Sequence, residues 1–212
     1  MDEPSGYILV TVPGASASGS ALTPTSVSLK DPASSPRQSW YAVTHVTIRE
    51  EEITVAEFKL QRLLPTLTVN VTGVPSGTTI AINVELVAES VMLTEKDTDG
   101  RYGVLQSAQT NADFGVLPVA GSVPDGSVVG MEKRLMPTAA GQSRSLLRIT
   151  TTTPDGTVLT NTADCPRMEL GRYYTLDFQY AALAPNMRFE AMTISDWQEG
   201  WAITGEILNP TH

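Results

Sequence analysis

Few residues of this 212-residue chain have the types and spacing that catalysis requires. Histidine occurs at two positions only, so a serine triad would need His45 or His212 as its base. His45 falls on the outer face of an expected strand, and His212 is the last residue of the sequence. We therefore expect no nucleophilic catalysis and predict that the protein is not an enzyme. Paired carboxylates for glycoside hydrolysis stay open as an alternative, because acidic residues are plentiful.

Sites for metals and cofactors are also not indicated. The sequence contains no GxSxG elbow, no Walker loop, no GxGxxG and no HExxH. Residues 96–100 (KDTDG) resemble the start of a calcium loop, but the later oxygen ligands are absent in register, so we expect a hairpin turn. Cys165 is the single cysteine, which we interpret as a buried small side chain. We predict no catalytic, cofactor-binding or metal-binding residues and no cofactor.

Composition limits the partners of the chain. With 14 basic and 23 acidic residues the net charge is -9, and no Lys/Arg cluster could neutralise a run of phosphates. We therefore expect no nucleic-acid partner. No apolar run approaches the roughly 20 residues of a membrane span. The first ten residues also lack the basic and apolar regions of a signal peptide.

The elements that position these residues are strands, and they are organised around residues 60–87. Apolar residues alternate with polar ones there, which is typical of half-buried strands. The predicted inward residues are Leu67, Val69, Val71, Ile80, Ile82, Val84 and Leu86. The intervening GVPSG (73–77) is too long for a two-residue turn, so we expect a longer loop or a connection between two sheets.

The second half of the chain continues the pattern. Leu147 and Ile149 share one inward face, as do Tyr174, Leu176 and Phe178, and Asp155-Gly156 gives the clearest hairpin signal. Further strands are expected at residues 7–12, 40–48, 53–60, 127–135 and 187–197, with a β-bulge near residues 56–57. No amphipathic helix longer than two turns is indicated. Irregular residues 105–124 are the expected boundary between two domains, at 1–112 and 113–212.

Several motifs resemble the Bacteroidales-type fimbrillin-like family, in its branch of minor fimbrial subunits and anchors. PSGYILV (4–10) looks like the family's PGxY strand, and KLQRLLP (59–65) before LTVNVTG looks like its L-x-R stretch. GRYYTL (171–176) is similar to a C-terminal strand of the family, and TISDWQEG (193–200) to its closing I-x-D-W-x-x-G signature. The resemblance covers about residues 6–201.

The resemblance implies an all-β protein of two transthyretin-like antiparallel β-sandwich domains. It also implies export as a lipoprotein to the outer membrane and assembly with other fimbrial subunits by β-strand addition. Family members begin with a lipoprotein signal and a lipid-modified cysteine, whereas Cys165 lies far too late in the sequence for that role. We therefore expect the first domain to be incomplete, with membrane attachment only through a lipid anchor that this chain lacks.

Two functions follow from these observations. The first is a non-catalytic structural component of a cell-surface fimbria, an anchor or minor subunit. The alternative is a surface lipoprotein that binds a glycan or a host protein. Exposed aromatic rings would favour the alternative, because sugars stack on them. The rings that decide the question are Trp40, Trp197 and Trp201.

Overall fold

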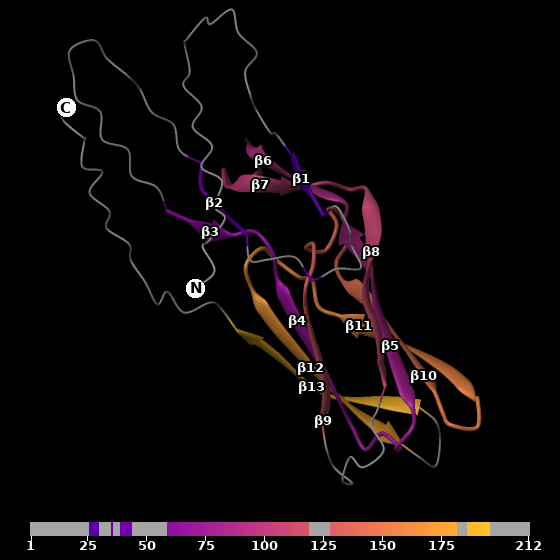
Figure 1. Ribbon diagram of the computed structural model, residues 1–212. Coiled ribbons are helices and arrows are strands. Elements are labelled where there is room, and N and C mark those ends of the chain that lie inside the picture. Colours follow the sequence, from indigo (N-terminus) through magenta and orange to yellow (C-terminus); the bar gives the residue numbers. More distant parts are fainter. Residues whose placement is uncertain are drawn as a thin grey trace, which may run out of the picture.

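The computed structural model describes residues 26–29, 35, 39–43, 59–118, 128–181 and 186–195. Within these ranges the chain forms strands, turns and extended segments and no helix (Figure 1). The predicted all-β class is therefore confirmed. His45, Trp197, Trp201 and His212 lie outside the described residues, as do the expected strand at 7–12 and the bulge at 56–57. The expectation of an incomplete first domain concerns these same segments and stays a prediction.

Two four-stranded sheets pack face to face as a β-sandwich. Sheet A has the order β13 (Asn186–Ser195), β12 (Tyr173–Ala181), β4 (Thr66–Thr72) and β9 (Val128–Arg134). Sheet B has the order β11 (Val158–Cys165), β10 (Ser145–Thr152), β5 (Thr79–Ala88) and β8 (Gln109–Pro118). At the sandwich's sides, β11 contacts β13 and β8 contacts β9. Each sheet edge thus lies beside an edge of the other sheet.

Two small sheets lie at one end of the sandwich, away from the tip of the β10–β11 hairpin (Figure 1). One contains β1 (Ser26–Ser28), β6 (Ser90–Lys96) and β7 (Tyr102–Leu105). The other pairs β2 (Trp40–Tyr41) with β3 (Gln61–Arg62). Of the strand expected at 40–48, residues 40–41 form β2, residues 42–43 lie outside any strand, and residues 44–48 lie outside the described residues.

The core contains the inward residues that the alternation predicts. Side chains of β4, β5, β10 and β12 fill it from both sheets, because the odd and even positions of each strand point to opposite faces. The predicted residues that are buried are Leu67, Val69, Val71, Ile80, Ile82, Val84, Leu147, Ile149, Tyr174, Leu176 and Phe178. These predictions are confirmed.

Leu86 is the exception among the predicted core residues. Its φ is 65°, a left-handed conformation that is unusual for a leucine, and its side chain is only half-buried. The pairing of β5 with β8 shifts register between Val84 and Val87 at this point. Such a bulge changes which residues face inward, so Val87 and Ala88 are buried in place of Leu86.

The connection at residues 73–77 joins the two sheets, as one of the predicted alternatives states. It leaves β4 in sheet A and enters β5 in sheet B. Gly73 and Gly77 have φ of 69° and 78°, which lets the chain leave one layer and enter the other without steric cost from a Cβ atom.

The predicted domain boundary at residues 112/113 is not followed by the described strands. It lies inside β8, and each large sheet contains strands from both sides of it. In sheet A, β4 pairs in parallel with β12, and in sheet B, β5 pairs antiparallel with β10. Alternation shows which face of a strand is buried but not which strand lies next to it. The described strands on both sides of this position share one core, and the division into domains at 1–112 and 113–212 stays a prediction.

Candidate interaction surface

The calcium-like motif is a turn. Asp97 Oδ1 accepts hydrogen bonds from the backbone N–H groups of Asp99, at 2.9 Å, and Arg101, at 2.8 Å. Gly100, with φ of 78°, completes the hairpin between β6 and β7. Because the Asp97 carboxylate is used by the turn itself, the prediction of a hairpin turn is confirmed. In the part of the chain that the structure describes, His, Cys, Asp and Glu residues form no group that could hold a metal ion.

Cys165 is buried at the end of β11, as predicted. Burial raises the pKa of its thiol to about 12, because the apolar surroundings disfavour the charged thiolate. A thiol is nucleophilic only when ionised, so Cys165 is a core side chain without reactivity at neutral pH.

Two of the motifs that resemble the fimbrillin-like family lie against each other. The guanidinium carbon of Arg62 is 4.8 Å from the centre of the Trp40 ring and 5.3 Å from that of Tyr173. Arg62 also donates a hydrogen bond to the Tyr173 hydroxyl. Burial, and secondarily the charge of Arg134, lowers the pKa of Arg62. At Gly171, where φ is 71°, a Cβ atom would lie 3.0 Å from Arg62 Cβ, so a larger residue would require Arg62 to shift.

This arrangement bears on the glycan-binding alternative. Trp40 is half-buried, and Arg62 stacks on its ring. A stacked guanidinium is a structural use of an aromatic face, and it occupies surface that a sugar would need. Trp40 therefore gives the glycan-binding alternative no support.

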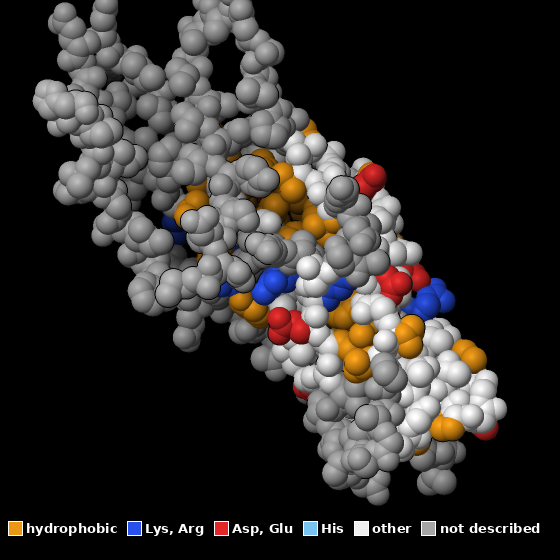
Figure 2. All heavy atoms as spheres, in the orientation of Figure 1, with side chains coloured by type: hydrophobic (Ala, Val, Ile, Leu, Met, Phe, Trp, Pro, Cys, Tyr) orange, Lys and Arg blue, Asp and Glu red, His pale blue; other side chains and the backbone are white. Residues whose placement is uncertain are grey.

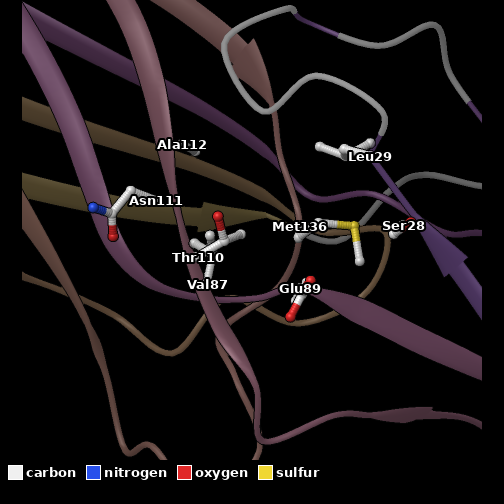
Figure 3. A pocket seen from close by; sticks show the side chains of 8 residues that line it. All are labelled: Ser28, Leu29, Val87, Glu89, Thr110, Asn111, Ala112 and Met136. Carbon is white, nitrogen blue, oxygen red and sulfur yellow. The ribbon is translucent and has the colours of Figure 1, made fainter.

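A small pocket lies between the β1–β6–β7 sheet and sheet B. Its volume is about 140 Å³, and its lining includes Val87, Glu89 and Met136. Figure 3 shows Ser28, Met136 and Glu89 close together, while Asn111 points away from them. Ligand sites for small molecules are usually several times larger and bring several polar groups together. The pocket is therefore a poor candidate for a catalytic or cofactor site.

The sheet edges are the remaining candidate surface, and the side formed by β8 and β9 is protected. Lys133 of β9 is 4% exposed, and it donates a hydrogen bond to the carbonyl oxygen of Asp113 in β8. Its ammonium group also lies 5.7 Å from the ring centre of Phe114. β8 is interrupted by two register shifts and ends at Pro118. Inward-pointing charge, bulges and proline are the features that prevent another strand from adding to an edge.

The opposite side presents β11, which has none of these features. Eight consecutive residue pairs join it to β10 without a register shift. Its sequence, VLTNTADC, contains no lysine, arginine, proline or glycine. Within the described residues β11 pairs on one side only, so alternate backbone N–H and C=O groups face outward from its free edge.

Three of the four exposed large apolar side chains among the described residues lie on edge strands. Val158 on β11 is 61% exposed, Val116 on β8 is 65% exposed and Met192 on β13 is 46% exposed. In Figure 2 the end of the molecule formed by the β10–β11 hairpin is mostly uncharged, with a few hydrophobic groups. A regular edge with a single charged residue and an exposed valine is a template for another strand.

The hairpin signal at Asp155-Gly156 predicts a strand after the turn but does not identify it as an edge. The absence of lysine, proline and glycine from β11 was a usable signal, since these residues mark protected edges. Which strands stand at the edges depends on long-range pairing, and no local pattern contains that information. None of the described residues forms a long apolar helix of the kind that crosses a bilayer.

No protein-family model and no curated protein sequence matches the chain. Solved structures do resemble it. A proposed cell adhesion protein from Bacteroides uniformis is 13% identical with a TM-score of 0.43, over 68% of this chain and 54% of that protein. One from Bacteroides ovatus is 14% identical with a TM-score of 0.40, over 66% of this chain and 48% of that protein. The tip fimbrial protein Mfa3 from Porphyromonas gingivalis is 14% identical with a TM-score of 0.36, over 65% of this chain and 52% of that protein.

Two of these neighbours are described as proposed cell adhesion proteins and the third as a tip fimbrial protein. The chain spans about half the length of each of them.

Proposed function

We propose that this chain is a non-catalytic structural component of a cell-surface fimbria, an anchor or minor subunit that joins its neighbours by β-strand addition. The observation that supports this best is the unequal protection of the sandwich's two sides. Lys133 bridges the β8–β9 side, whereas β11 on the other side is regular, uncharged along most of its length and paired only with β10 among the described residues. A subunit of an assembly can use such an edge to bind a strand of its neighbour.

The sequence motifs give the second line of support. The L-x-R and GRYYTL segments, which resemble the fimbrillin-like family, are positioned by direct contact between Arg62 and Tyr173. They therefore stabilise the junction of β3, β4 and β12 and do not form a reaction centre. Cys165 is buried and protonated at neutral pH, and Asp97 is used within its turn. These uses of the candidate chemical groups fit a structural role.

Location follows from the same proposal. The protein would act on the extracellular face of the outer membrane or within the fimbrium, with other fimbrial subunits as partners. A lipid anchor is part of what the family resemblance implies.

Deleting the gene in the source organism and examining sheared fimbriae by electron microscopy and immunoblotting tests the proposed role. We expect fimbriae that are fewer, shorter or detached, and we expect the protein to co-purify with fimbriae from the undeleted strain. Complementation with the native chain should restore both. Unchanged fimbriae that lack the protein would contradict the proposal.

A further inference from the structure

We infer that β11 is a self-association edge, at which two copies of this chain pair antiparallel about a two-fold axis at Asn161 to form one continuous eight-stranded sheet. The inference goes beyond the proposed fimbrial role, because two copies could pair in this way whatever the rest of the assembly is. Its basis is the residue pattern of β11 and the chemistry of the register that this pattern allows.

The pattern of β11 is self-complementary when Asn161 faces its own copy. On the outer face, exposed Thr160 then lies opposite Thr162 of the second copy, and Val158 lies opposite Asp164. Cross-strand threonine pairs stabilise antiparallel sheets. The chain already contains such a pair one strand further in, where Thr150 and Thr160 hydroxyls lie 3.1 Å apart. The outer face of the proposed junction would thus continue a pairing that sheet B uses internally.

The inner face is complementary in the same register. Leu159 lies opposite Ala163 of the second copy, and both side chains are only half-buried in the single chain. Pairing would bury the rest of this apolar surface, which favours association. Asn161 would meet its own copy, and an amide side chain both donates and accepts, so the two can hydrogen-bond to each other.

Charge favours this register over its neighbours. Asp164 is the one charged residue of β11, and it is already paired with Arg144 at 2.8 Å. With the axis at Asn161, the two Asp164 residues stand at opposite ends of the junction and face a valine, so no like charges meet. Moving the axis to Thr162 would place Thr160 opposite Asp164 and Leu159 opposite the buried Cys165. An axis at Thr160 would place the Asp155-Gly156 turn against the end of β11.

The neighbouring edge strand of sheet A, β13, adds a further contact between the two copies. β13 lies beside β11 on the same side of the molecule, and its Met192 is 46% exposed. With a two-fold axis perpendicular to the sheet, the β13 edges of the two copies approach each other as well. A junction of two strands alone would be smaller than a stable interface, so this second layer contributes contact area. We expect reversible dimers that dissociate on dilution.

The test is sedimentation velocity of the full chain over about a hundredfold range of concentration. The native chain should shift from monomer to dimer as the concentration rises. In the variant Thr160→Lys/Thr162→Lys, lysine faces lysine across the axis, and we expect dimer to be lost at every concentration. Thr150→Lys is the control, because it puts a lysine on the same face one strand away from the edge. Thermal melting followed by circular dichroism checks that each variant is folded.

Cysteine cross-linking tests the register independently. Under mild oxidation Asn161→Cys should form a disulfide-linked dimer, since directly opposed residues in antiparallel strands lie within disulfide range. Thr160→Cys alone should link poorly, whereas its mixture with Thr162→Cys should form the heterodimer. Buried Cys165 contributes little background because its thiol stays protonated.

Each outcome decides the inference. A chain that stays monomeric throughout overturns it and leaves the edge to a strand of a different protein. A dimer that persists in Thr160→Lys/Thr162→Lys, or a Thr160→Cys variant that links to itself as readily as Asn161→Cys, overturns the site or the register. None of these results decides the fimbrial role, which the gene deletion tests separately.

Discussion

Asn70 Nδ2 donates a hydrogen bond of 2.8 Å to Asp177 Oδ1, across two strands that run parallel and lie 107 residues apart in the sequence. Both side chains are half-buried on the outer face of sheet A. Gly130 of β9 is paired with Asn70 on the other side of β4, and a Cβ atom at Gly130 would lie 2.9 Å from Asn70 Oδ1. The alternation of residues 66–72 predicts only that Asn70 points outward, because it lies between inward Val69 and Val71. Its side chain in fact links the two halves of the chain.

Replacing Asn70 by alanine should lower the free energy of unfolding by about 1 kcal/mol, because a partly buried carboxylate loses a hydrogen-bond donor. Urea denaturation of Asn70→Ala, Asp177→Ala and the double variant measures the coupling between the two residues. Thr175→Ala, on the same face of β12, is the control and should change stability less. Strictly additive effects of the two substitutions would show that the hydrogen bond contributes nothing.

The pattern of burial could be predicted from the sequence, and the neighbours of each strand could not. Period-two alternation placed Leu67, Ile82 and Leu176 in the core, since side chains of an extended chain alternate sides. A strand has the same alternating residue pattern whether its neighbour is antiparallel, parallel or absent. The parallel β4–β12 pair, and the position of β11 as an edge among the described strands, therefore became visible only in the structure. Leu86 was misplaced because a bulge shifts the register of its strand without any glycine or proline to mark it.

Ile82 is the most informative position for the core. It is 1% exposed and lies opposite Ile149 in the neighbouring strand of sheet B. Ile82→Asp would bury an unpaired carboxylate, which should cost several kcal/mol and unfold the protein. Ala81→Asp places the same charge on the outer face of the same strand, and we expect it to stay folded. Circular dichroism and sedimentation distinguish the outcomes, and a folded Ile82→Asp with an unchanged melting temperature would contradict this placement.

Substitutions at two glycines of the β6–β7 hairpin distinguish the cost of backbone strain from the cost of steric crowding. Gly100 has φ of 78° with no atom within 4 Å of a Cβ placed there. At Gly103, with φ of 96°, a Cβ would lie 2.7 Å from the Tyr41 hydroxyl oxygen. That hydroxyl donates to the carbonyl oxygen of Tyr102 at 3.1 Å. We expect Gly100→Ala to cost roughly 1 kcal/mol. Gly103→Ala should cost more in urea denaturation, because it also displaces Tyr41. Equal losses would mean that Tyr41 moves aside freely.

The dependence of stability on alkaline pH should contain a contribution from Cys165. Burial raises the pKa of its thiol in the folded protein to about 12, from an ordinary value of 9.0. As pH rises, the unfolded chain therefore loses this proton first, and ionisation of the unfolded state favours unfolding. The contribution is fully present below about pH 8 and is lost progressively as pH rises from 9 toward 12.

Comparison with Cys165→Ala isolates this contribution, because burial also raises the pKa of Tyr41 and Tyr174, and those effects are common to both proteins. The difference in free energy of unfolding between the two proteins should be constant near neutral pH. Above about pH 9 the native protein should lose stability relative to Cys165→Ala, with a slope that approaches 1.4 kcal/mol per pH unit. Urea denaturation at a series of pH values measures it. Parallel profiles for the two proteins up to about pH 10.5 would show that the folded-state thiol ionises as readily as a free one, and that β11 opens enough to expose it.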